Sequence, residues 1–220
     1  PSTVPLTINW LVTEPFAGSG GHTGIFRMIR HLVEFGHTCH VHTIPVNFMH
    51  KYTPAEIEQY VETNFMPTGA IFHQWNGEPG PADATVATYW KTVPLLMQLP
   101  NPGRRYYLVQ DFEPYFYPVG GEYIQAENTY RQGLHCITLG PWLAKLMAEK
   151  YGAEADHFDF AVDTEVYAPS PAPRPAQRSH GSVGALDEVR TQVDGAVEVE
   201  QVGVVVMHGL QWASSRAAGG

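Results

Sequence analysis

The fold is decided by residues 7–44, which read TINWLVTEPFAGSGGHTGIFRMIRHLVEFGHTCHVHTI. Thr7–Val12 is mostly apolar and has the length of a buried strand. After a glycine-rich loop, apolar residues recur with helical spacing across 25–33, and Gly36 stands where a helix C-cap glycine is expected. Thr38–Ile44 then reads as a second strand. A strand, a helix and a strand in this order favour a parallel pair joined by a right-handed crossover.

The same alternation continues to about residue 152. Thr53 and Pro54 are suited to the N-cap and first position of a helix, and Pro141 and Gly152 to the two ends of another, with Trp142, Leu143, Leu146 and Met147 turned inward. The predicted helices cover 54–65, 121–133 and 141–151, and further strands cover 70–73, 84–88, 105–109 and 135–139. This pattern predicts an α/β fold with an open, doubly wound, Rossmann-like and mainly parallel sheet.

The chain changes character near residue 169. All aromatic residues except Trp212 precede residue 170, and four prolines lie between Ala168 and Pro175. We therefore expect one α/β domain over 1–168 and a linker with a weakly ordered tail over 169–220.

Composition excludes several classes of protein. The net charge of -9 argues against a nucleic-acid binder, which needs a basic patch. No stretch approaches the roughly 20 apolar residues of a membrane-spanning helix. Cys39 and Cys136 cannot form a disulfide framework, so we expect buried thiols and a cytoplasmic protein, with at most a peripheral contact to the inner face of the membrane.

The loop after the first strand is a candidate anion site. Gly20, Gly21, His22 and Thr23 stand between a strand and a helix, where glycines allow close approach and free helical N–H groups favour a phosphate. The alternative interpretation is that the glycines only form a tight turn and bind no ligand. A dinucleotide fits poorly, because its pattern requires a third glycine where Thr23 stands and an acidic residue after the second strand.

Three segments together resemble a known family. Residues 20–38 (GGHTGIFRMIRHLVEFGHT) look like the first helix of retaining GT-B-type glycosyltransferases of family 4. Residues 109–118 (VQDFEPYFYP) and 126–131 (AENTYR) resemble the rhamnosyltransferases that build bacterial S-layer and surface rhamnan glycans. Further likeness lies at 140–143, 149–152 and 162–164, so that the resemblance covers about residues 6–168.

The resemblance implies a transferase with two facing Rossmann-like domains. It implies transfer of rhamnose from a nucleotide-activated donor, dTDP-rhamnose, to a surface polysaccharide with the configuration retained, without metal or another cofactor. The N-terminal domain would hold the acceptor and contact the donor diphosphate. In the donor domain of such a transferase, basic residues and a pair of glutamates spaced about a turn or two apart are expected, and residues 170–220 show neither arrangement. We therefore expect this chain alone to be inactive and hypothesise that the tail is out of frame. Phe160-Ala161 and Gln110 depart from the family pattern, where many relatives carry Asn-Gly and histidine.

Polar and aromatic side chains follow the strand that ends at Val109. Asp111 and Glu113 are candidate catalytic residues, because carboxylates at a strand end can orient acceptor hydroxyls or stabilise charge on the sugar. A capping pair is the alternative interpretation. Candidates for binding acceptor or sugar are Trp90, Gln110, Tyr115 and Tyr117. Of the four aromatics at 112 and 115–117, we expect two to serve packing only.

Three other hypotheses are less well supported. His37, His40 and His42 lie near one another, but no further ligands with recognisable spacing complete a zinc site, so we predict no metal. The domain is alternatively a non-catalytic or vestigial carbohydrate-binding module, or a nucleotide-dependent oxidoreductase. The sequence leaves the acceptor, the linkage, the donor base and sugar, and the oligomeric state open.

Overall fold

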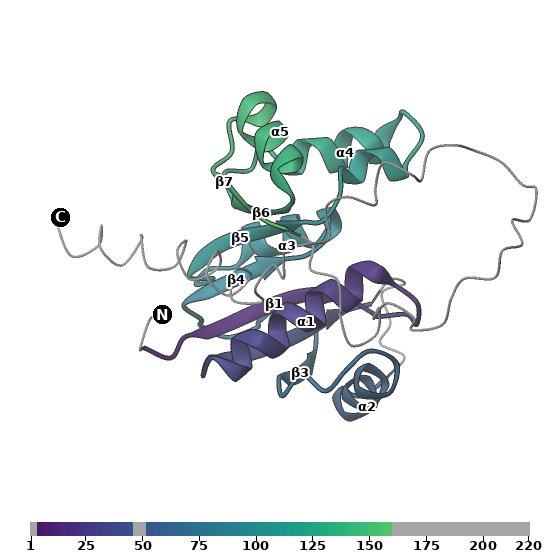
Figure 1. Ribbon diagram of the computed structural model, residues 1–220, viewed down its shortest axis with the longest axis vertical. Helices are drawn as coiled ribbons and strands as arrows, with labels where there is room; N and C mark the ends of the chain where they lie inside the picture. Colours follow the sequence, from purple (N-terminus) through teal and green to yellow (C-terminus); the bar gives the residue numbers. More distant parts are fainter. Residues whose placement is uncertain (1–3, 46–51, 160–220) are drawn as a thin grey trace, which may run out of the picture.

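A computed structural model describes residues 4–45 and 52–159 (Figure 1). The predicted linker and tail over 169–220 lie outside the described residues, as does the end of the predicted domain at 168. The boundary between them therefore stays a prediction.

Seven strands form one sheet in the order β3-β2-β1-β4-β5-β6-β7, and every neighbouring pair is parallel. The strands are β1 (Thr7–Thr13), β2 (Thr38–Ile44), β3 (Ile71–Gln74), β4 (Ala84–Ala87), β5 (Arg104–Val109), β6 (His135–Leu139) and β7 (Ala155–Phe158). This topology confirms the predicted open, doubly wound α/β fold with a Rossmann-like sheet.

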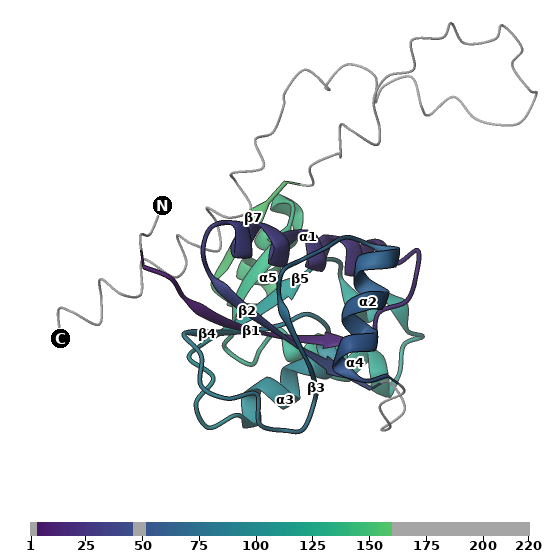
Figure 2. The same ribbon diagram turned by 90° about the horizontal axis from the view of Figure 1, so that it is seen from below.

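Helices cover both faces of the sheet (Figure 2). They are α1 (Gly20–Glu34), α2 (Pro54–Asn64), α3 (Val93–Gln98), α4 (Gly121–Thr129) and α5 (Pro141–Tyr151), with 3-10 turns η1 (Trp90–Thr92) and η2 (Glu113–Phe116). Helices α1 and α2 pack with Trp10 in one core cluster, and α3 and α5 pack with Leu11 in the other. Neighbouring residues of β1 thus enter opposite cores, because side chains alternate along a strand.

The predicted helix ends have specific caps. Gly36 has a φ of +92°, and the His37 N–H donates to the Leu32 carbonyl at 3.0 Å, which closes α1 in a Schellman motif. At the start of α2, the Thr53 N–H donates to Glu56 at 2.8 Å, and the Glu56 N–H donates to the Thr53 hydroxyl at 3.3 Å. Both ends lie within one or two residues of their predicted positions.

The structure also differs from the predicted elements. The helix predicted over 121–133 ends at Thr129, because the next three residues hydrogen-bond three positions back. The short elements α3 and β7 were not predicted. The prediction that Trp142 points inward is wrong: it is 58% exposed, whereas Leu143 is buried, so the buried stripe of α5 is rotated away from Trp142.

Three histidines stack on one face of β2 and β3. The His40 Nδ1 and His73 Nε2 atoms are 2.9 Å apart, and the rings of His42 and His73 have centroids 4.8 Å apart. His42 is buried and its Nε2 lies 3.2 Å from the Asn9 Oδ1, which can only accept, so His42 donates. Burial, together with smaller contributions from the neighbouring His73 and His40, lowers the pKa of His42 to about 3. His42 is therefore neutral at physiological pH.

We predict that the cluster weakens the fold in acid. In the unfolded chain, His42 gains a proton below about pH 6.5, whereas in the folded protein it stays neutral until about pH 3. The contribution of the neutral His42 to the free energy of unfolding is therefore full above pH 6.5 and is lost as the pH falls toward 3. The free energy of unfolding should fall by up to about 1.4 kcal/mol per pH unit from this residue. Urea unfolding of H42Q between pH 7 and 4 should show a shallower dependence than wild type. H157Q, on exposed β7, is the matched control for loss of one imidazole.

Candidate functional site

The candidate site lies where the order of the strands reverses. Strands β1 and β4 are neighbours at the centre of the sheet, but the chain after β1 crosses to one face and the chain after β4 to the other. In open α/β sheets, this reversal leaves a crevice beyond the carboxyl ends of the strands. The segments that follow β1, β4 and β5 contain all the residues predicted to bind or act on substrate.

The predicted phosphate-binding residues form the first turn of α1 rather than a loop. Ser19 is the N-cap: its hydroxyl accepts the His22 N–H at 3.3 Å and its carbonyl accepts the Thr23 N–H at 3.1 Å. Within the described part of the chain, the N–H groups of Gly20 and Gly21 have no such acceptor. These two groups, at the positive end of the α1 dipole, are therefore the ones available to an anion.

His22 is buried beneath this turn instead of facing a ligand. Its Nε2 lies 3.2 Å from the Thr13 carbonyl, which can only accept, so Nε2 carries the proton and Nδ1 accepts the Ser19 hydroxyl at 2.8 Å. Burial lowers the pKa of His22, which keeps the ring neutral. The imidazole thus joins the end of β1 to the start of α1 and fixes the glycine turn in place. The Thr23 hydroxyl is also engaged, donating to the Ser19 carbonyl at 3.0 Å.

Gln110 lies against the glycine turn. A Cβ placed on Gly21 would lie 3.5 Å from the Gln110 Nε2, and one on Gly24 only 2.9 Å from its Oε1. The structure thus brings a predicted sugar-binding side chain at the end of β5 beside the predicted phosphate-binding turn of α1. Gly24 was not predicted as a site residue, because its role depends on a contact between segments far apart in the sequence.

Tyr89, Trp90 and Tyr117 form an aromatic cluster after β4 and β5. The Trp90 Nε1 donates to the Tyr117 hydroxyl at 3.0 Å, and the hydroxyls of Tyr89 and Tyr117 hydrogen-bond to each other. The Lys91 ammonium lies 5.0 Å from the centre of the Trp90 ring and forms an ion pair with Glu122 at 3.2 Å. Two of the predicted sugar-binding residues are therefore in contact, although Trp90 is only 5% exposed.

Further aromatic side chains are exposed near the carboxyl ends of β1, β5 and β6. Tyr115, a predicted sugar-binding residue, is 71% exposed, and Phe116 beside it is also exposed. Phe112 is buried, so one of the four aromatics at 112 and 115–117 serves packing alone. Phe16 and Trp142 are exposed near the same edge, and sequence analysis did not assign either to the site.

The two predicted catalytic carboxylates have different surroundings. Asp111 is exposed and its Oδ1 accepts the Phe112 N–H at 2.7 Å. Glu113 is buried: its Oε2 accepts the Trp90 N–H at 2.7 Å, and its own N–H donates to the Tyr130 hydroxyl at 3.1 Å. Burial, with a smaller contribution from the charge of Asp111, raises the pKa of Glu113 to about 8, although the hydrogen bond from the Trp90 N–H opposes the rise. Asp111 is thus the carboxylate that a substrate can reach, and Glu113 positions Trp90.

The structure offers no arrangement for a metal among the described residues. No group of three or more His, Cys, Asp or Glu side chains there is placed to hold an ion. Among the same residues, no helix is long and apolar enough to cross a membrane.

We predict that G24A moves Gln110 without harming the fold. The new methyl group displaces only the end of a flexible side chain, and alanine should stabilise the helix by roughly 0.5–1 kcal/mol over glycine. In NMR spectra, the side-chain amide resonances of Gln110 should shift in G24A. They should not shift in the control G20A, whose added Cβ has no atom within 4 Å. Unchanged Gln110 resonances in G24A would contradict the contact.

We predict that E113Q makes the protein less sensitive to alkali. Glu113 stays protonated up to about pH 8 in the folded protein, but it ionises near pH 4.5 in the unfolded chain. Its contribution to the free energy of unfolding is therefore full below pH 4.5 and is lost as the pH rises toward 8. Between pH 5 and 8 the wild type should lose about 2–4 kcal/mol of stability through this group, and E113Q should not. Denaturant unfolding at both pH values measures the difference, with E122Q, an exposed glutamate on α4, as the control.

Comparison with known proteins gives one informative similarity. No protein-family model matches the chain. The chain is similar to the O-antigen biosynthesis protein RfbC of Myxococcus xanthus, with 30% identity over 135 residues, covering 55% of this chain and 11% of that protein. The chain therefore spans about a tenth of the length of this relative.

Proposed function

We propose that this chain acts in glycan biosynthesis as the acceptor-side domain of a glycosyltransferase. The similarity to an O-antigen biosynthesis protein and the Rossmann-like parallel sheet support this proposal. More narrowly, we propose transfer of rhamnose from dTDP-rhamnose to a surface polysaccharide with retention, without metal or another cofactor, at the cytoplasmic side of the membrane. The support for rhamnose is the resemblance at residues 109–118 and 126–131.

The observation that carries the proposal is the convergence at the β1–β4 reversal. The backbone N–H groups of Gly20 and Gly21 lie there at the start of α1, and Gly21 is beside the side-chain amide of Gln110. The cluster of Trp90 and Tyr117 follows from the neighbouring β4 and β5. The N–H groups suited to a phosphate and the aromatic side chains suited to sugar rings therefore lie at the same edge of the sheet. A nucleotide sugar and a glycan acceptor require both.

Each group then has a role in transfer. The N–H groups of Gly20 and Gly21 bind a donor phosphate, and Gln110 hydrogen-bonds a sugar hydroxyl. Asp111 orients the acceptor hydroxyl, since it is the accessible carboxylate of the pair. Glu113 does not reach substrate but holds the Trp90 backbone through its hydrogen bond.

One observation favours a non-catalytic carbohydrate-binding domain as the second candidate. Glu113, one of two predicted catalytic carboxylates, is 4% exposed and already bonded to the Trp90 N–H. A site with a single accessible carboxylate can hold a glycan without transferring one. Detection of transfer by a protein that contains this domain, and its loss in D111N, would exclude this candidate.

The proposal is tested by NMR titration of the isotope-labelled chain. dTDP should shift the backbone amides of Gly20 and Gly21, and methyl α-L-rhamnoside should shift the Gln110 side-chain amide and the Trp90 indole N–H. Q110A should weaken rhamnoside binding by roughly fivefold, because one hydrogen bond contributes about 1 kcal/mol. The amides of Gly36 and Gly152, at helix C-termini, are internal controls. If neither ligand shifts the residues of the β1–β4 reversal, the proposal is wrong.

A further inference from the structure

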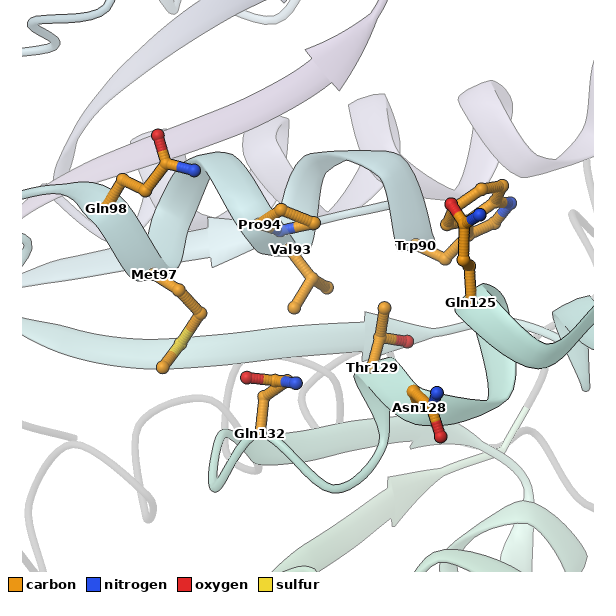
Figure 3. A pocket seen from close by; sticks show the side chains of 9 residues that line it. All are labelled: Trp90, Val93, Pro94, Met97, Gln98, Gln125, Asn128, Thr129 and Gln132. Carbon is orange, nitrogen blue, oxygen red and sulfur yellow. The ribbon is translucent and has the colours of Figure 1, made fainter. Parts of the chain in front are cut away.

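A groove with a volume of about 340 Å³ lies between α3 and α4, on the flank of the sheet (Figure 3). Its size is within the range of pockets that hold small ligands. Trp90 and Gln125 lie near one end of the groove, and Gln98, Met97 and Gln132 lie toward the other. The path from Trp90 along α3 to Gln98 is roughly 12 Å, from the rise per residue of a helix. The groove is therefore longer than a single sugar ring.

The lining of the groove is uncharged and rich in amides. Of its nine lining residues none is charged, and four carry side-chain amides: Gln98, Gln125, Asn128 and Gln132. All four are exposed. Within the described residues, the side-chain amides of Gln98, Gln125 and Gln132 neither donate nor accept a hydrogen bond.

The floor of the groove has a different chemistry from its rim. Val93 is buried and Met97 half-buried, and the hydroxyl of the buried Thr129 is already committed to the Ala126 carbonyl at 2.7 Å. The floor thus offers mainly apolar contact. An apolar floor below uncommitted amides matches a sugar, whose C–H faces are apolar and whose hydroxyls both donate and accept. A phosphate or a nucleic acid would instead require cations.

Trp90 connects the groove to the candidate site. Its side chain lines the end of the groove and also donates to Tyr117 in the aromatic cluster. A glycan held by the cluster would therefore extend between α3 and α4. We propose that this groove is an extended subsite for a neutral oligosaccharide, which binds the acceptor chain several sugars away from its reacting end. This inference rests on the proposed function, because that function supplies the glycan.

The test uses linear neutral hexasaccharides of rhamnose, mannose, galactose and N-acetylglucosamine, titrated into the isotope-labelled full chain. At least one should shift the side-chain amide resonances of Gln98 and Gln132. It should bind about tenfold more tightly than its monosaccharide, because it engages both the aromatic cluster and the groove. Methyl α-L-rhamnoside alone should leave the Gln98 and Gln132 resonances in place.

Variants separate the groove from the rest of the site. The double variant Q98A/Q132A should weaken hexasaccharide binding by roughly five- to tenfold, since two amides are lost, and leave monosaccharide binding unchanged. Both positions are exposed, so the fold should be retained, and Q59A on α2 is the matched control. The inference is overturned if no hexasaccharide shifts the groove amides, or if Q98A/Q132A binds as the wild type does. Failure of the proposed function has a different readout, at Gly20, Gly21 and Gln110.

Discussion

The pairing of β1 with β4 is the constraint on which the site depends. All four residues of β4 are buried, and the pairing aligns Leu11 of β1 with Ala87, the last residue of β4. The Thr88 hydroxyl then donates to the Leu11 carbonyl at 2.8 Å, which fixes the point where the chain leaves β4 relative to β1. The chain crosses to one face of the sheet after β1 and to the other face after β4. The first turn of α1 and the aromatic cluster that contains Trp90 therefore both lie at the carboxyl-end edge of the sheet. A different neighbour for β1 would separate them.

Glu113 is the second point on which this edge depends. Burying an ionised carboxylate costs free energy, so burial raises the pKa of Glu113. The carboxyl is therefore protonated, and uncharged, at neutral pH. Its side chain accepts from Trp90 after β4, and its backbone donates to Tyr130 after α4. One residue after β5 therefore ties together three segments. Trp90 in turn lines both the aromatic cluster and the groove, so a displaced Glu113 would disturb both surfaces without touching a ligand.

The fold was predictable largely because its signals are local. The strand, helix and strand over 7–44 alternate with clear periodicity, and the caps at Gly36 and Thr53 depend on residues within a few positions. Elements without such signals were missed. The six residues of α3 are too few for a helical period to emerge, and β7 (ADHF) has no buried residue and therefore no apolar run that would mark a strand. Both form because the sheet offers a surface to pack against and an edge to pair with.

The place of the candidate residues on the sheet was predictable, but the orientation of their side chains was not. The rule that parallel strands present ligands at their carboxyl ends locates the glycine turn, Gln110 and Trp90 together. It cannot say which way a side chain turns. Asp111 and Glu113 are two residues apart and look equivalent in sequence, yet one is exposed and the other is enclosed beside Tyr130. His22 likewise stands in the expected turn, but faces Thr13 because a neutral imidazole there satisfies a strand-end carbonyl.

Under the proposed function, the edge of the sheet has one part suited to an anion and another part suited to a neutral sugar. On the α1 side, the N–H groups of Gly20 and Gly21 and the helix dipole stabilise an anion by only about 1 kcal/mol. On the other side, Lys91 is already paired with Glu122, and the groove is lined by uncharged residues. A diphosphate bound here would therefore draw most of its counter-charge from groups beyond these residues, whereas a neutral glycan would find its partners within them. That asymmetry agrees with the proposed role as an acceptor-side domain, which would contact the donor and hold the acceptor.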